Sequence, residues 1–293
     1  MPSSLQSHVD LPLIDISQFP SEFDCKTLNC LQNNPGLAVV REACKEWGFF
    51  YVGNHGIPID LLQQMEFQSR QIYSVLAEAK ERAVTCDPFM SYQCRGNAES
   101  FTMLNLPESD SINELSNKIW PLEEKSAMFS ETFRTYSLHM AELARKICKI
   151  ILASLGLDAE NFYHLHFENF TAYMRINHYF SDAKSVEEEL LLGHTDIGCF
   201  TILYQDNNGG LQIRSKEGEW LNVKPISHSF VVNLGDSMKA WSNGIYRSAE
   251  HRVVCKGWVD RFSVPYFVRF PRDQQIWAPD ELVNDEHPRR YRP

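Results

Sequence analysis

The sequence predicts an α+β protein with helices concentrated in its first half and strands in its second half. From about residue 171 to residue 269, short β-prone segments alternate with Gly and Asn turns, which is typical of an all-β sandwich or barrel. Between 123 and 155, apolar residues recur every three or four positions, the period of a helix that is buried along one face. The pattern alone leaves open which sandwich or barrel the strands form.

The composition is that of a globular enzyme. Of the 293 residues, 43% are hydrophobic, which is ample for the core of one large domain or two small ones. The net charge of −10 and the lack of a basic cluster interleaved with aromatics argue against nucleic-acid binding. The longest apolar stretches are too short to span a membrane.

Cysteine usage and the first residues indicate the cellular compartment. The eight cysteines show no CxxC or zinc pattern, and residues 1–10 lack the basic and apolar regions of a signal peptide. We therefore expect reduced thiols and a cytoplasmic protein, able to reach the nucleus by diffusion.

The elements before residue 170 follow from periodicity and from Pro and Gly boundaries. We expect strands at 11–16 and 49–52, helices at 35–48, 59–84, 123–155 and 159–167, and little regular structure at 90–111. His55 lies in a Gly-rich turn, so we interpret it as bonded to backbone groups. The His8-Val9-Asp10 pattern near the terminus is interpreted as unrelated to metal binding. His164 and His166 are expected at the surface or as helix caps.

The first strand of the β-rich half, 171–179, alternates regularly. Arg175, Asn177 and Tyr179 fall on one face, which is either a solvent face or the inside of the fold. Further strands are expected at 199–204, 211–214, 219–223, 229–234, 252–255 and 261–269.

A candidate metal site begins at His194-Thr195-Asp196, which we expect at or near the start of a strand. Residues two apart on a strand point to the same side, so His194 and Asp196 can face one ion. His251 is the natural third ligand. Two histidines and one carboxylate leave three octahedral positions open, the arrangement of non-haem Fe(II) oxygenases.

A candidate acid-binding pair follows ten residues after His251. Arg261 and Ser263 share a strand face and combine a planar guanidinium fork with a hydroxyl donor, a pairing that suits a carboxylate. A dicarboxylic keto acid could chelate iron at one end and rest on Arg261 and Ser263 at the other.

These motifs, in this order and with these gaps, resemble one family. They are His194-Thr195-Asp196, Asn233-Leu234-Gly235-Asp236, Trp241-Ser242-Asn243-Gly244, Glu250-His251-Arg252-Val253 and Arg261-x-Ser263. The chain is similar to the 2-oxoglutarate- and Fe(II)-dependent dioxygenases, in particular to the plant soluble branch that includes gibberellin oxidases, auxin oxidase and anthocyanidin synthase. Phe180 departs from the family pattern, which often has Pro there.

The resemblance implies a double-stranded β-helix, or jelly-roll, core flanked by helices, with a helical N-terminal region. The implied divisions are an N-terminal region at 1–122 that caps the active site, spine helices at 123–170, the jelly-roll core at 171–272 and a C-terminal segment at 273–293. Tyr179 and Asn177 are implied to help Arg261 and Ser263 hold 2-oxoglutarate.

The implied activity is oxidation of a C–H bond, with release of succinate and CO2. The cofactors would be Fe(II), with 2-oxoglutarate and O2 as co-substrates and ascorbate as a candidate reductant. The implied substrate is a small, fairly apolar metabolite such as a plant hormone or specialised metabolite, acted on by a monomer. The candidate pocket residues are Phe267, which faces inward by strand parity, and then Phe180, Phe200, Tyr204, Phe101 and Ile276.

Two other functions stay open at this point. One is a non-haem iron oxidase that keeps the Arg-x-Ser pair but does not use 2-oxoglutarate. The other is a non-catalytic ligand-binding relative, against which the intact His194, Asp196 and His251 set argues.

Overall fold

The computed structural model describes residues 7–20, 34–85, 92–121, 123–181, 187–256 and 258–292. The described helices are η1 (Ile16–Gln18), α2 (Pro35–Glu46), α3 (Ile59–Tyr73), α4 (Ala77–Glu81), α5 (Ser111–Ile119), α6 (Glu124–Ser154), α7 (Ala159–Phe162), the π-helical η2 (Tyr163–Phe167), α8 (Asp236–Trp241) and η3 (Asp280–Leu282). Together with the strands described next, these helices confirm the predicted α+β class.

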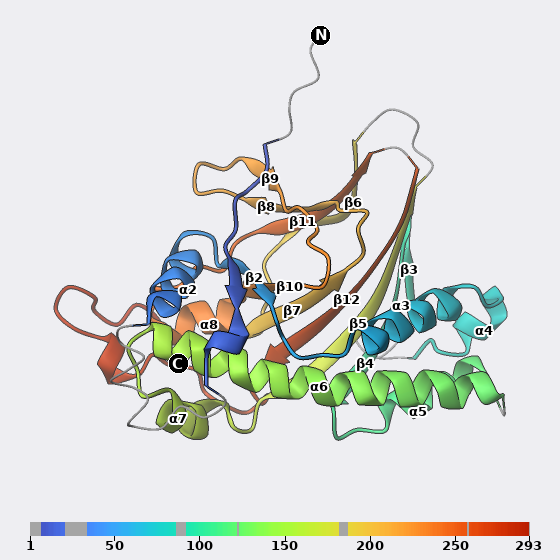
Figure 1. The fold of residues 1–293 in the computed structure, drawn as a ribbon, viewed down its shortest axis with the longest axis horizontal. Helices are drawn as coiled ribbons and strands as arrows, with labels where there is room; N and C mark the ends of the chain where they lie inside the picture. Colours follow the sequence, from blue (N-terminus) through green and yellow to red (C-terminus); the bar gives the residue numbers. More distant parts are fainter. Residues whose placement is uncertain are drawn as a thin grey trace, which may run out of the picture.

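The strands form two sheets that face each other (Figure 1). The large sheet has the order β1 (Leu13–Asp15), β2 (Phe49–Gly53), β10 (Phe230–Leu234), β7 (Phe200–Gln205), β12 (Val259–Arg269), β5 (Thr171–Ser181), β4 (Ala98–Leu106) and β3 (Gln93–Arg95). The small sheet has the order β6 (Glu187–His194), β11 (His251–Lys256), β8 (Leu211–Arg214) and β9 (Trp220–Asn222).

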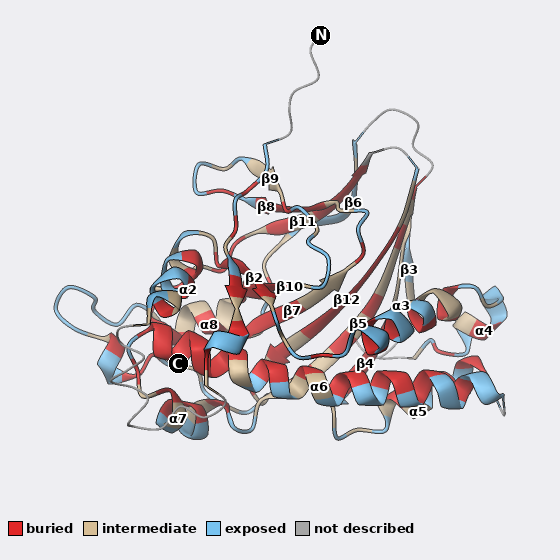
Figure 2. Cartoon of the chain, viewed as in Figure 1, coloured by how far each residue is buried: buried red, intermediate tan, exposed pale blue. Residues whose placement is uncertain are grey.

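Helix α6 packs along the outer side of the large sheet (Figure 1). Its apolar residues recur at helical spacing, and Phe129, Phe133, Tyr136 and Met140 are fully buried. The chain then turns at Gly156, whose φ of +84° disfavours other residues. The main core therefore lies between this helix layer and the large sheet, as the burial colouring of Figure 2 shows.

The other face of the large sheet looks toward the small sheet. Along β12, Phe262, Val264 and Tyr266 belong to the main core, whereas Arg261 and Ser263 line a cavity on the opposite face. Strand parity thus sends alternate residues of β12 into the space between the two sheets.

Several sequence-based boundaries differ from the structure. The helix predicted at 59–84 is interrupted between α3 and α4, where the Ser74 hydroxyl donates to the Gln71 carbonyl and competes with helical bonding. The segment 159–167 is helical, but its second half is a π-helix.

The structure also tests the predictions made for His55 and for the cysteine thiols. His55 accepts a hydrogen bond at Nδ1 from the backbone of Ile57 (3.1 Å), which confirms its structural interpretation. Cys44, Cys94, Cys148, Cys199 and Cys255 are free thiols. The other three cysteines, Cys25, Cys30 and Cys86, lie outside the described residues. Within the described ranges, no helix has the length and apolar character needed to cross a membrane.

Candidate metal centre

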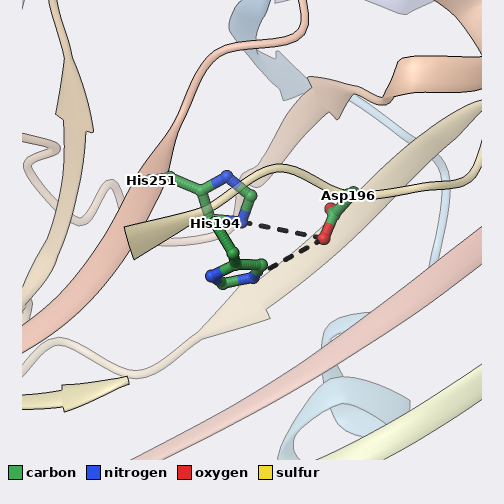
Figure 3. A group of neighbouring side chains, drawn as sticks. All are labelled: His194, Asp196 and His251. Atoms are coloured by element: carbon green, nitrogen blue, oxygen red, sulfur yellow. Dashed lines mark ion pairs between the residues drawn. The ribbon is translucent and has the colours of Figure 1, made fainter. Parts of the chain in front are cut away.

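Two adjacent strands of the small sheet and the loop after one of them bring three side chains together. His194 is the last residue of β6 and His251 the first of β11, and the two are paired across the strands. Asp196 follows in the loop that leads to β7. The Nε2 atoms of His194 and His251 lie 3.7 and 3.8 Å from the Asp196 Oδ1 atom (Figure 3).

This placement corrects the expected local geometry. His194 ends a strand instead of starting one, so His194 and Asp196 do not share the face of one strand. The chain turns after His194, and this turn carries the Asp196 carboxylate toward the two imidazoles. The predicted group of three is nevertheless brought together.

Both imidazoles are oriented by backbone carbonyls. The Nδ1 atom of His194 lies 2.8 Å from the Leu192 carbonyl oxygen, and that of His251 lies 3.2 Å from the Ala249 carbonyl oxygen. Because a carbonyl can only accept, each Nδ1 carries the proton and each Nε2 keeps its lone pair. Burial lowers the pKa of His251, which favours the neutral, metal-binding form of the ring.

The Asp196 carboxylate is held by two donors at one oxygen. Its Oδ2 atom accepts from the Thr201 hydroxyl (2.5 Å) and from the Asn233 side-chain amide (2.7 Å). The Oδ1 atom is left facing the two Nε2 atoms. The Asp236 backbone N–H also donates to the Asp196 carbonyl (2.7 Å), which fixes the loop against the start of α8.

The three side chains fit a divalent metal ion. One donor atom from each of His194, Asp196 and His251 lies within 4.8 Å of the other two. Donors that each lie about 2 Å from one ion are at most about 4 Å apart, and both nitrogen–oxygen separations meet this limit. Their fixed tautomers and the hydrogen-bonded carboxylate also match the supporting contacts of metal ligands.

Arg261 lies opposite this group, on the large sheet, and its side chain is almost fully buried. Its Nη1 donates to the Ser263 hydroxyl (3.3 Å) and its Nη2 to the Gln205 side-chain oxygen (3.1 Å). Among the described residues its Nε has no partner. A buried guanidinium with no paired carboxylate suits an anionic ligand.

Two further predicted residues join Arg261. Its guanidinium lies 5.2 Å from the ring centroid of Tyr179, and the Asn177 amide donates to the Ser263 hydroxyl (3.5 Å). Burial raises the pKa of Tyr179, so its hydroxyl stays protonated and can donate. The structure therefore brings together all four residues predicted to hold a dicarboxylic keto acid.

A single cavity of about 540 Å³ joins the two groups. It is lined by His194, Asp196 and His251, by Asn177, Tyr179, Arg261 and Ser263, and by the apolar residues Leu190, Leu191, Leu192, Leu203, Leu211, Val253, Pro265 and Phe267. Phe267 is thus placed where strand parity predicts it.

The other five pocket candidates are corrected, because none of them lines this cavity. Phe101 and Phe200 point to the opposite faces of their strands and are buried in the main core. Tyr204 and Ile276 pack against that core, and Phe180 lies beside His178 with ring centroids 5.3 Å apart. We withdraw all five as pocket residues.

Comparisons with known proteins agree with this geometry. Residues 170–270 match the 2OG-Fe(II) oxygenase superfamily, and residues 11–126 match the N-terminal region described as that of a non-haem dioxygenase in morphine synthesis. A gibberellin 20-oxidase-like protein of Arabidopsis thaliana is 34% identical, and the alignment covers 94% of this chain and 85% of that protein. The chain belongs to the 2-oxoglutarate- and Fe(II)-dependent oxygenases.

Solved structures of family members have the same fold. The dioxygenase for auxin oxidation from rice has a TM-score of 0.81 at 30% identity, over 97% of this chain and 91% of that one. The dioxygenase for auxin oxidation 1 from Arabidopsis thaliana, in its complex with 2-oxoglutarate, has a TM-score of 0.80 at 26% identity, over 96% of this chain and 100% of that one.

The family assignment confirms several predictions. The chain is an oxidoreductase of the plant-type 2-oxoglutarate oxygenases, it uses Fe(II) and 2-oxoglutarate, and its α+β fold has the jelly-roll core. The family match favours use of 2-oxoglutarate over the alternative of an iron oxidase that does not use it, and succinate release separates the two.

Sequence reasoning missed the residues that support Asp196. Asn233 belongs to a motif that carried the family resemblance, yet its role was not inferred, and Thr201 lies in a segment interpreted only as a strand. Both residues point into the space between the sheets. Each is a polar residue in an otherwise apolar strand. Strand parity, which assigns alternate residues to opposite faces, is the signal that would have found them.

Proposed function

We propose that His194, Asp196 and His251 hold the Fe(II) of this oxygenase and that Arg261, Ser263, Tyr179 and Asn177 hold 2-oxoglutarate. The observation that carries this proposal is the placement of the two groups on facing sheets, across one cavity. A dicarboxylic keto acid can then reach the metal with its keto-acid end while its other carboxylate meets the guanidinium fork.

Each residue contributes by binding and orientation. When bound, Fe(II) and 2-oxoglutarate supply the activation of dioxygen that oxidises a C–H bond and yields succinate and CO2. With three protein ligands, a bound Fe(II) would remain accessible to 2-oxoglutarate and dioxygen from the cavity. Burial of Arg261 and the apolar walls keep water away from the reacting atoms and strengthen the charge interactions there.

We propose a small, mostly apolar organic molecule as the substrate, of the hormone or specialised-metabolite class. A cavity of about 540 Å³ suits a compound of that size, and Leu203, Val253 and Phe267 give it apolar walls. Relatives named for gibberellin and auxin oxidation support this choice. The expected reaction is hydroxylation or another oxidation that begins at a C–H bond of this molecule.

The regional division proposed above is supported by the cavity walls. Gln93 and Ser100, from the N-terminal region 1–122, line the cavity, in agreement with a capping role.

We predict that the chain acts as a cytoplasmic monomer without nucleic-acid or membrane partners. Light scattering after size-exclusion chromatography and imaging of a tagged protein test it.

The first experiment is an anaerobic titration with Fe(II) and 2-oxoglutarate. We expect the weak visible charge-transfer band of an iron-chelated keto acid, followed in air by succinate release that depends on an added metabolite. His194→Ala should remove both the band and the turnover. Metal binding without the band would contradict the keto-acid site, and absence of metal binding would support a ligand-binding protein instead.

A further inference from the structure

We propose that Asp206 is a positioning residue for Arg261 and sets the affinity for 2-oxoglutarate without contacting it. This inference rests on the proposed function, in which Arg261 meets the far carboxylate of the keto acid. Asp206 is buried, and it does not line the cavity. It begins the turn at 206–210, which links β7 of the large sheet to β8 of the small sheet.

The Asp206 side chain holds the backbone of β12 directly after Arg261. Its Oδ2 atom accepts from the backbone N–H of Phe262 (2.7 Å). The backbone N–H of Asp206 donates in turn to the Phe262 carbonyl oxygen (3.1 Å). A hydrogen bond to an ionised carboxylate is about twice as strong as a neutral one. This contact therefore fixes the direction in which the Arg261 side chain leaves the strand.

The same turn also holds the backbone before Arg261. The Asn208 side-chain amide donates to the Oδ2 atom of Asp206 (3.1 Å) and to the carbonyl oxygen of Asp260 (2.8 Å). The Asn208 backbone N–H donates to the other carboxylate oxygen of Asp206 (3.1 Å). Asp260 and Phe262 flank Arg261 in the chain, so the turn is bonded to β12 on both sides of the arginine.

Both ends of the turn lie against the Arg261 side chain itself. Gln205, the last residue of β7, accepts from the Nη2 atom of Arg261 (3.1 Å). At the other end, a Cβ placed on Gly210 would lie 3.7 Å from the Arg261 Cδ atom and would collide with the Val254 carbonyl oxygen. The turn can pass this close because Gly210 has no side chain.

The charge of Asp206 acts on Arg261 without occupying its donors. Among the described residues, Asp206 forms an ion pair with Arg70 of α3 (3.7 Å) and none with Arg261. Burial lowers the pKa of Arg261, whereas the interactions with Tyr179 and with Asp206 raise it. The guanidinium thus keeps its charge in a buried position, and its fork stays available to a carboxylate ligand.

Arg70 connects this arrangement to the N-terminal region, since α3 lies beside β12 (Figure 1). Its Nη1 atom lies 3.6 Å from the Oδ2 atom of Asp260, and its guanidinium lies over the Phe262 ring (4.2 Å to the centroid). Glu66, one helical turn earlier, holds Arg70 in place (2.9 Å). We therefore expect α3 to contribute to the affinity for the co-substrate.

The test compares the wild-type enzyme with Asp206→Asn in anaerobic titrations with Fe(II) and two keto acids. 2-Oxoglutarate carries the far carboxylate, and 2-oxopentanoate has the same five-carbon chain without it. The charge-transfer band gives a dissociation constant for each. Both oxygens of Asp206 accept from N–H donors, so an amide nitrogen at either position faces a donor. We expect Asp206→Asn to weaken binding of 2-oxoglutarate roughly 3- to 10-fold and to leave binding of 2-oxopentanoate unchanged.

Two further variants extend the test. Asn208→Ala removes the amide that joins Asp206 to Asp260, at an exposed position, and decides the question if Asp206→Asn does not fold. Arg70→Gln removes the link to α3. Each should weaken binding of 2-oxoglutarate alone, roughly 2- to 5-fold. The matched control is Asp280→Asn, which removes a surface ion pair with Arg289 (2.6 Å) and should bind both keto acids as wild type does.

The outcomes separate this inference from the proposed function. Weaker binding of 2-oxoglutarate alone, at unchanged Fe(II) affinity, assigns Asp206 to the positioning of Arg261. Equal weakening of both keto acids would show general damage to the site. Unchanged binding of 2-oxoglutarate by the Asp206 and Asn208 variants would show that Arg261 keeps its position without the turn. Either of these two results overturns the inference. A wild-type enzyme that gives no band with either keto acid would overturn the proposed function and this inference with it.

Discussion

His194 and His251 are direct partners across β6 and β11, and each imidazole is held by the carbonyl two residues before it in the chain. The same local contact therefore sets the tautomer of both rings. With both Nε2 atoms directed toward Asp196, the three donors converge on one point. Residues that support this arrangement should accordingly affect metal affinity more than folding.

Asn233→Leu should weaken Fe(II) binding, because it removes the amide that donates to the Asp196 carboxylate. Loss of such a supporting contact typically lowers metal affinity about 10- to 100-fold. Thr201→Val removes the second donor and should act in the same direction. Anaerobic calorimetric titration with Fe(II) measures both. Ser229→Ala is the control, because its hydroxyl donates to the Ile226 carbonyl, away from the loop that carries Asp196. Unchanged affinity in all three variants would contradict the role of Asn233 and Thr201.

Arg261→Lys should raise the KM for 2-oxoglutarate and leave Fe(II) affinity unchanged. Lysine keeps the charge but lacks the planar fork, and a lost charged hydrogen bond corresponds to roughly a 10- to 100-fold change. Succinate release at varied 2-oxoglutarate measures the effect. Arg269→Lys is a control at the far end of the same strand, where the side chain bonds Thr171 instead. A KM equal to that of wild type would remove Arg261 from the co-substrate site.

The sequence predicted what depends on local periodicity. Helix α6 was expected at 123–155 and is found at Glu124–Ser154, because one continuous apolar stripe defines it. Parity also placed Arg261, Ser263 and Phe267 together on one face of β12. The order and spacing of His194, Asp196 and His251 were also sufficient to predict that these three side chains come together. The position of His194 at the end of a strand was not predicted.

The misplaced pocket residues and the missed strand belong to elements whose two faces are both buried or both exposed. All five residues of β10 are buried, so alternation disappears in such strands of the large sheet, and an aromatic side chain gives no sign of the face it occupies. Phe101 and Phe200 were misplaced for this reason. Strand β6 was missed because it is mostly exposed and begins with three glutamates, residues with low strand propensity. Helix α8 is a single short segment without a usable period.

Phe133→Ala should destabilise the enzyme without a specific effect on the metal site. The side chain is fully buried in α6 and lies 4.5 Å from Phe129, measured between ring centroids. Truncation of a buried phenylalanine typically costs about 3–5 kcal/mol. Leu138→Ala, on the exposed side of the same helix, should change stability by about 0.5 kcal/mol or less. Urea denaturation compares them, and similar losses in the two variants would argue against α6 as the support of the large sheet.

Gly235→Ala should damage folding and metal binding together, because the position has no space for a side chain. A Cβ there would lie 2.2 Å from the Gly198 carbonyl oxygen and 2.7 Å from that of Asp196. Both are backbone atoms, so the contact can be relieved only by displacing the loop that carries Asp196. We expect a loss of about 1–3 kcal/mol in unfolding free energy, together with weaker Fe(II) binding. In the control Gly53→Ala, the new Cβ approaches only the flexible Leu13 side chain, with a nearest distance of 3.3 Å, so both quantities should stay near wild type. A Gly235→Ala enzyme that is destabilised but binds Fe(II) normally would show that the loop can move without carrying the carboxylate with it.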